Sequence, residues 1–163
     1  MDWAQVEAGL GSAVSQAPKS GGPERHTCWL TTIDPDGKPH VTSVGALWVD
    51  GAFWFQTGKG TVKAKNVARD PRCSLAVATH DFDLVVEGEA EHVTDPKLVA
   101  MMAEAWAAQG WPASPDESGT GITAPFNAPN TGPPPWFVYR ITAKTAKLVG
   151  TVEETDGAAR FSF

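Results

Sequence analysis

Cysteine and histidine are scarce in this sequence of 163 residues, and those present form no disulfide or metal-binding pattern. Cys28 and Cys73 are the only two cysteines, and they do not belong to a Cys-x-x-Cys motif. The four histidines lack the short, regular spacing of metal ligands. We therefore expect reduced thiols, no disulfide scaffold and no metal site.

Signals for membranes and for parallel-sheet nucleotide folds are also missing. No apolar run approaches the ~20 residues needed to cross a bilayer, and the N-terminus lacks the basic start and apolar core of a signal peptide. Walker and Gly-x-Gly-x-x-Gly motifs are absent. The 13 basic and 19 acidic side chains give a net charge of −6, which disfavours nucleic acid and anionic membranes as partners. These absences predict a cytoplasmic protein. The length of the sequence predicts a single domain, residues 1–163.

Turn signals at short intervals divide much of the chain into β-strands. The sequences DPDGKP and DG separate three apolar segments that should form a meander. Strands are expected at 27–33, 40–49, 52–57, 73–79 and 84–93, with one or two more in 135–152. Six or seven strands linked by short turns predict an antiparallel barrel or sandwich.

Three segments carry helical patterns. Residues 2–16 are expected to form a helix followed by a linker at 17–25. A short helix is expected at 61–69, and a longer one should begin after Asp95, with Pro96 in its first turn. The apolar stripe predicted for this last helix consists of Leu98, Met101, Met102, Ala105 and Trp106.

A proline-rich segment, 112–135, holds seven of the 13 prolines. Segments this long without regular structure are uncommon inside compact domains and are often functional. Its apolar residues Ile122 and Phe126 indicate that it packs on something. A surface excursion and a lid over a pocket both remain open.

A cluster of basic, hydroxyl and glycine residues occupies the junction between the predicted strand 52–57 and the helix 61–69. The first N–H groups of a helix lack backbone partners and attract anions, most readily phosphate. Glycines let a ligand approach the backbone, and lysines supply charge. The predicted anion cradle consists of Thr57, Gly58, Lys59, Gly60, Thr61, Lys63 and Lys65. The alternative is a solvated basic helix for which Thr61 is only the N-cap.

Gly45 lies in the middle of the predicted strand 40–49, where glycine normally weakens a strand. Close approach of a flat ligand to the backbone is one explanation, and a β-bulge is the other. Because the Asp50–Gly51 turn joins this strand to 52–57, we expect the Gly45 region to lie near the anion cradle.

The segments DGKPH, TGKGTVKAKN with DPR, and VVEGEAEHVTD, taken in this order, resemble the FMN-binding split-barrel superfamily. This superfamily includes pyridoxamine 5′-phosphate oxidase and the flavin/deazaflavin oxidoreductases. The resemblance covers about residues 24–152. It implies a mainly β fold with peripheral helices, a six-stranded antiparallel split β-barrel.

The resemblance also implies a homodimer with two cofactor sites at the subunit interface. In the superfamily, the strand that matches His40–Leu47 runs along the cofactor ring, and the segment that matches Thr57–Lys65 holds the phosphate. The cofactor-binding residues implied are His40, Thr42, Ser43, Val44, Gly45, Gln56, Thr57, Gly58, Lys59, Thr61, Lys63 and Lys65.

The resemblance leaves two cofactors open, FMN and the deazaflavin F-420. Three lysines in one short segment suit the longer and more anionic tail of F-420. The C-terminal AARFSF does not match the Arg- and His-bearing end of true pyridoxamine phosphate oxidases, so oxidation of vitamin B6 is not expected.

The expected activity is that of an oxidoreductase, in which the cofactor transfers hydride to or from a small conjugated organic substrate. Catalytic side chains are not assigned. His40 is either a proton donor or a hydrogen-bonded structural histidine. The alternatives to an enzyme are a non-catalytic module that binds a flavin, F-420 or haem, and an interaction domain without a cofactor.

Overall fold

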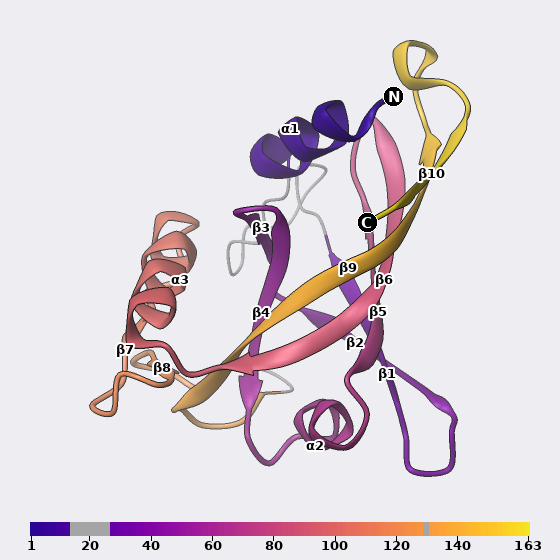
Figure 1. The fold of residues 1–163 in the computed structure, drawn as a ribbon. Coiled ribbons are helices and arrows are strands. Elements are labelled where there is room, and N and C mark those ends of the chain that lie inside the picture. Colours follow the sequence, from indigo (N-terminus) through magenta and orange to yellow (C-terminus); the bar gives the residue numbers. More distant parts are fainter. Residues whose placement is uncertain (14–26, 129–130) are drawn as a thin grey trace.

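The computed structural model describes residues 1–13, 27–128 and 131–163, and one antiparallel sheet of ten strands dominates this part of the chain (Figure 1). The predicted mainly β fold is confirmed. The strands are β1 (Cys28–Ile33), β2 (Pro39–Val44), β3 (Leu47–Val49), β4 (Ala52–Gly58), β5 (Arg72–Ala78), β6 (Phe82–Val93), β7 (Ser114–Pro115), β8 (Ile122–Thr123), β9 (Trp136–Gly150) and β10 (Ala158–Ser162). The helices are α1 (Trp3–Ala13), α2 (Val62–Arg69), α3 (Pro96–Ala108) and the 3-10 turn η1 (Glu153–Thr155).

The sheet is closed by a strand that changes partner. The strand order is β2-β1-β5-β6-β9-β4-β3, so β2 and β3 lie at opposite edges although only Gly45 and Ala46 separate them. The prediction that residues 40–49 form one continuous strand is therefore wrong. The first half of this segment pairs with β1, and the second half pairs with β4. The predicted meander breaks at the same place. Taken as one interrupted strand, β2 and β3 complete the six-stranded split barrel.

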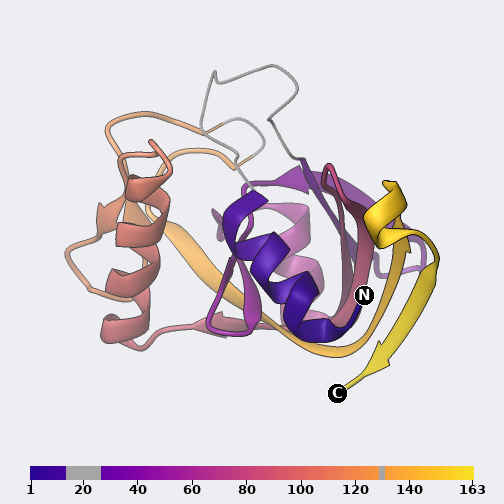
Figure 2. The same cartoon turned by 90° about the horizontal axis from the view of Figure 1, so that it is seen from above.

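The barrel interior is the first of two apolar cores. Val6 and Leu10 of α1 enter it from one end, and Ala64 and Val67 of α2 enter it from the other. Figure 2 shows α1 lying across the mouth of the barrel. Because both helices insert apolar side chains into the barrel, its two ends are closed by helix packing.

The second core lies outside the barrel, between α3 and the β3-β4-β9 part of the sheet. The helix begins as predicted, since Asp95 caps it by accepting a hydrogen bond from the backbone N–H of Lys97, with Pro96 in the first turn. Its buried stripe is shifted from the prediction. The buried residues are Val99, Met102, Ala103 and Trp106, whereas Leu98, Met101 and Ala105 are only partly buried.

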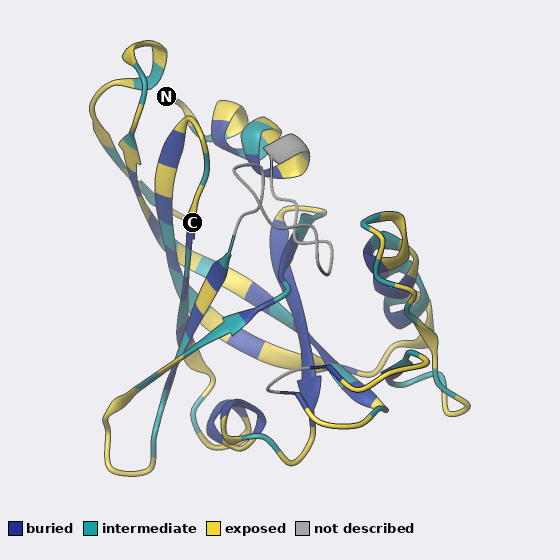
Figure 3. Cartoon of the chain, turned by 180° about the vertical axis from the view of Figure 1, so that it is seen from behind, coloured by how far each residue is buried: buried dark blue, intermediate teal, exposed yellow. Residues whose placement is uncertain are grey.

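Long strands β6 and β9 present a charged outer face, visible as exposed segments in Figure 3. Glutamates of β6 pair with cations of β9: Glu87 with Lys147 at 3.0 Å, Glu89 with Lys144 at 3.8 Å, and Glu91 with Arg140. Exposed ion pairs of this kind contribute little stability each. These charged side chains keep this face of the barrel exposed to solvent.

Both chain ends meet at the α1 end of the barrel. The ring of Trp3 lies 5.1 Å from that of Phe161 and 4.6 Å from that of Phe163, so the C-terminal strand β10 holds the start of α1. The predicted helix 2–16 is described only to residue 13, and the predicted linker 17–25 lies outside the described residues. Within the described ranges, none of the helices has the length and apolar character needed to span a membrane.

The proline-rich segment packs on the second core. Its short strands β7 and β8 pair with each other, and Ile122 is fully buried beside Trp136. Phe126 lies against the rings of Trp111 and Trp136. The reading as a simple surface excursion is therefore wrong for the described part of this segment.

Replacing Leu10 tests whether α1 is part of the barrel core. Leu10→Ala is expected to lower the free energy of unfolding by about 2–5 kcal/mol, because it leaves a cavity in the core. Glu7→Ala, on the same helix but not in the core, is expected to change it by less than about 0.5 kcal/mol. Urea unfolding measures both. Equal, small effects would show that α1 is not packed on the barrel.

Candidate functional site

The turn between β4 and α2 is built around two hydroxyl groups. Thr61 is the N-cap: its Oγ1 accepts from the backbone N–H of Ala64 at 3.3 Å and donates to the carbonyl of Gly58 at 2.9 Å. Thr57 is fully buried, and its Oγ1 lies 3.1 Å from that of Thr61. Since Thr61 gives its only hydroxyl hydrogen to Gly58, Thr57 donates to Thr61. The predicted N-cap is confirmed, and the Thr61 hydroxyl is already committed within the turn.

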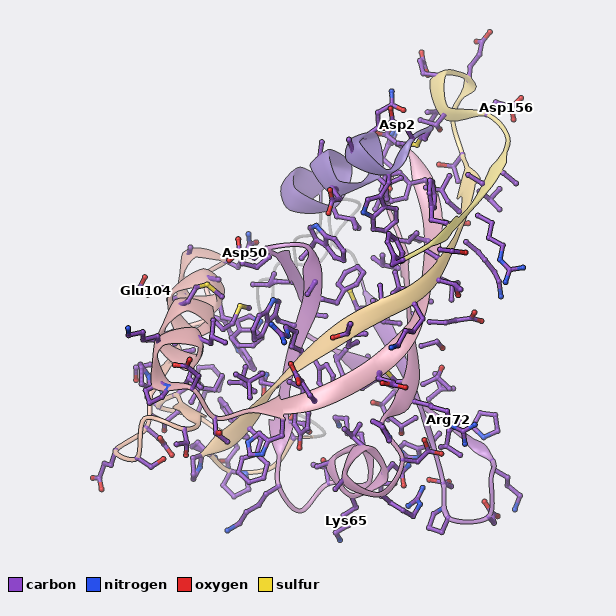
Figure 4. All side chains as sticks on the ribbon, in the orientation of Figure 1. Asp2, Asp50, Lys65, Arg72, Glu104 and Asp156 are labelled. Carbon is purple, nitrogen blue, oxygen red and sulfur yellow. The ribbon has the colours of Figure 1, made fainter. Side chains whose placement is uncertain are left out.

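The three lysines of the segment do not point the same way. Lys63 is only 3 % exposed, although it is charged, and burial lowers the pKa of its ammonium group. Lys59 and Lys65 are exposed, and Figure 4 shows Lys65 extending away from α2. Two positions apart on a helix corresponds to about 200°, so Lys63 and Lys65 must face opposite sides. A cradle in which all three lysines converge is therefore wrong, and Lys63 alone faces inward.

Glycines 58 and 60 have different roles. A Cβ on Gly58 would lie 2.2 Å from the carbonyl oxygen of Thr131, so the proline-rich segment already occupies the space beside it. A Cβ on Gly60 would meet nothing within 4 Å. Gly58 therefore allows the Thr131 region to pack closely against the end of β4. Gly60 leaves open space.

The pairing of β3 with β4 ends at Leu47 and Trp54, and from there the chain crosses to β2, which pairs with β1 instead. We call the part of the barrel wall between β2 and the second half of β4, where this pairing is interrupted, the wedge. The two strands that border it each carry a buried polar atom that has no hydrogen-bond partner among the described residues. These atoms are Thr42 Oγ1 on β2 and Gln56 Oε1 on β4.

The other predicted residues of β2 divide between two faces. His40 and Val44 share the inner face with Thr42, because they pair with the buried Thr32 and Cys28 of β1. Ser43 pairs with the exposed Trp29 and so faces outward. This strand alternation means that Ser43 is not on the face that carries Thr42.

Gly45 marks the break between two strands, and its predicted role in the approach of a ligand stays a prediction. It lies at the break between β2 and β3, and its carbonyl accepts a hydrogen bond of 3.0 Å from the indole N–H of Trp106 on α3. The break itself explains why a flexible residue is used there. Trp106 fixes the point at which the strand changes partner.

A polar cluster that the sequence analysis missed centres on Asn66. Its amide donates to Thr32 Oγ1 at 3.1 Å and to Asp34 Oδ1 at 2.8 Å, and its carbonyl accepts from Arg69 at 3.2 Å. His40 Nδ1 lies 3.9 Å from the same Asp34 oxygen. Only the position of Asn66 three residues after Lys63, on an adjacent helix face, could have drawn attention to it.

No group of three or more histidine, cysteine or acidic side chains with metal-binding geometry occurs in the described ranges. Burial raises the pKa of the Cys73 thiol to about 12, which keeps it protonated at neutral pH. The described groups of this region are therefore a capped helix start with a buried lysine, and two buried polar atoms on the strands that border the wedge.

Comparison with known families gives a match to the model described as pyridoxamine 5′-phosphate oxidase, over residues 17–125. The chain belongs to the pyridoxamine 5′-phosphate oxidase family. The matched range includes β1 to α3, and so all of the candidate site up to the Thr131 contact. No curated protein matches the chain.

Solved structures of similar fold have varied descriptions. A conserved hypothetical protein, Rv2991 from Mycobacterium tuberculosis, is 25% identical with a TM-score of 0.61, covering 90% of this chain and 82% of that one. A haem-binding protein from Mycobacterium smegmatis is 16% identical with a TM-score of 0.66, over 99% of this chain and 58% of that one. An F420 reductase is 17% identical with a TM-score of 0.52, over 86% and 94%. The last two likenesses show the fold alone.

Replacing Lys63 tests how the burial of its ammonium group affects the pH dependence of stability. The unfolded chain binds more protons than the folded one between the lowered pKa and the ordinary value of 10.5, so the free energy of unfolding should rise with pH in that window. Lys63→Met is expected to remove this rise. Urea titrations at pH 7 and 10 measure the free energy of unfolding of each variant. Lys65→Met, at an exposed site, should keep the wild-type slope; an equal loss in both variants would contradict the assignment.

Replacing the two glycines tests the packing of the proline-rich segment. Gly58→Ala is expected to lower the free energy of unfolding by about 1–3 kcal/mol, because the added methyl group overlaps a backbone carbonyl. Gly60→Ala should change it little, since the space around it is open. Thermal and urea unfolding compare the two. A tolerated Gly58→Ala would mean that the Thr131 region does not rest on β4.

Proposed function

We propose that this protein is an oxidoreductase that uses bound F-420 or FMN to transfer hydride to or from a small conjugated organic substrate. The observation that carries the proposal is the burial of Lys63 at the start of α2, next to a wedge with unpaired polar atoms on both sides. Membership of a family named for the oxidation of a phosphate-bearing substrate supports it.

The anionic end of the cofactor is expected beside the buried lysine. Burial disfavours the charged form of an ammonium group, and a nearby negative charge favours it. A phosphate beside Lys63 would add such a charge, and the positive end of the α2 dipole would add to the attraction. Because the Thr61 hydroxyl is committed to Gly58 and Ala64, Lys63 and the helix start are the groups expected to hold the phosphate.

The ring end of the cofactor accounts for the unpaired polar atoms. Buried polar groups in native proteins almost always have partners, so the hydroxyl of Thr42 and the carbonyl oxygen of Gln56 call for a ligand. Flavin and deazaflavin rings carry N–H and C=O groups on one edge and are otherwise flat and apolar. We propose that such a ring lies between β2 and β4, where Thr42 shares the inner face with Leu30 and Gln56 shares the outer face with Trp54.

The exposed Lys59 favours the longer cofactor. FMN ends at its phosphate, whereas the tail of F-420 continues into glutamate carboxylates. Lys59 immediately precedes the helix start and is exposed, as a contact to a tail leaving the site would require. F-420 is thus the preferred cofactor, with FMN as the second.

The chain's own contribution to the reaction would be binding, orientation and exclusion of water. The bound ring supplies the hydride chemistry. His40 lies on the inner face of β2 near Asp34, so it is oriented by the protein but not assigned a proton-transfer step. The likeness of the fold to a haem-binding protein keeps a non-catalytic binding module as the alternative.

We further propose that a second copy of the chain docks on the outer face of the barrel around Trp29. The indole is 50% exposed, and Val41 and Val149 are 54% and 55% exposed on the same sheet. Asp83 and Lys147 line the same depression, so the surface carries both charge signs and can pair with itself about a two-fold axis. Such a copy would lie against β2, one wall of the wedge.

Cofactor titration tests the proposed function. The protein is titrated with F-420 and with FMN, and turnover is then measured with the reduced cofactor or NAD(P)H and a panel of conjugated enones and quinones. Tight binding with hydride transfer is expected. Lys59→Ala should weaken F-420 and leave FMN unchanged, with Ala107→Glu on α3 as a neutral surface control. Binding without turnover would favour the binding module, and failure to bind either cofactor would reject the proposal.

Charge placed on the Trp29 face tests the second copy. Trp29→Glu is expected to convert a dimer to a monomer, because it buries an unpaired carboxylate in the proposed interface. Sedimentation or light scattering measures the mass, and Ala107→Glu should remain dimeric. A monomeric wild-type protein, or a dimeric Trp29→Glu variant, would contradict this docking surface.

A further inference from the structure

The Asn66 side chain is one of the most completely satisfied polar groups in the protein. It is 1% exposed, donates two hydrogen bonds from Nδ2 and accepts one at Oδ1. Its partners are Thr32 at the end of β1, Asp34 in the β1–β2 turn, and Arg69 on its own helix. Arg69 in turn donates to the carbonyl of Ile33. Two residues of α2 therefore clamp the β1–β2 turn.

This clamp joins the two halves of the candidate site. On the helix side, Asn66 lies one turn beyond the buried Lys63. On the sheet side, Thr32 pairs with His40 of β2, and the Asp34 carboxylate is 3.9 Å from the His40 ring. The anion-binding helix is thus tied to the strand that forms one wall of the wedge.

The clamp acts at the turn that leads into β2. In the described part of the chain β2 is an edge strand that pairs only with β1. The turn is exposed, and its own backbone bonds run between Asp34 and residues 37 and 38. Asn66 and Arg69 therefore add side-chain hydrogen bonds that hold this turn against α2.

We propose that Asn66 is a positioning residue that couples the phosphate end of the site to its ring end. Its amide fixes how far β2 lies from the start of α2, so that one ligand reaches Lys63 and the wedge at the same time. This inference rests on the proposed function, since it concerns a ligand with both a ring and an anionic tail. Asn66 itself need not touch that ligand.

Coupling between the two ends of the site affects ligand binding differently from a general loss of stability. A ligand with ring and phosphate gains from both ends only when their spacing is correct, whereas the ring alone needs only the wedge. Removing Asn66 should weaken the phosphate-bearing ligand more than the ring alone. A variant that only unfolds a fraction of the protein weakens both by the same factor.

The experiment compares dissociation constants for ligand pairs that differ only in the tail. The pairs are FMN with riboflavin, and F-420 with the same deazaflavin ring lacking the phosphate-bearing tail. Asn66→Ala is expected to weaken the phosphate-bearing member at least 10-fold and the tail-less member less than 3-fold. Lys97→Ala, at an exposed position at the start of α3 and outside the proposed site, should leave the ratio within 2-fold of the wild type.

A second variant guards against poor folding of Asn66→Ala. Thr32→Val removes one partner of the amide and keeps the side-chain shape, so the ratio should shift the same way by a smaller factor. An unchanged ratio in both variants would overturn the inference while leaving the proposed function intact. A wild-type protein that binds none of the four ligands would overturn the proposed function, and the inference with it.

Discussion

The change of partner at Gly45 and Ala46 is the constraint on which the rest of the fold depends. One segment cannot pair continuously with both β1 and β4, so it divides between them and closes the sheet without completing every backbone ladder. The indole of Trp106 fixes the crossing point from outside the barrel. The wedge, its unpaired polar atoms and the dependence of β2 on α2 all follow from this incomplete closure.

Two residues near the start of α2 carry a local cost. Lys63 is buried, and this burial lowers the pKa of its ammonium group. Gly58 gives up side-chain packing so that the Thr131 carbonyl can approach. Proteins commonly accept such local costs at functional sites, provided that the surrounding structure is well packed. Here the packing comes from the helix ends inserted into the barrel.

Local chemistry made some elements predictable and long-range contacts made others unpredictable. The caps at Thr61 and Asp95 depend on neighbours in the sequence, and both were correctly expected. The orientation of Lys65 could not be predicted, because it depends on which face of α2 packs against the barrel. The roles of Gly58 and Asn66 depend on Thr131 and Thr32, which are far away in the sequence. The family resemblance predicted the barrel, but it did not predict the break between β2 and β3.

The meeting of Trp3 with Phe161 and Phe163 places both chain ends at the end of the barrel remote from α2 (Figure 1). Domains whose termini are neighbours tolerate circular permutation and insertion into host proteins. A surface tether or a fused reporter attached at either end would therefore stand clear of the wedge. The same closeness means that one short peptide could join the ends into a cyclic chain.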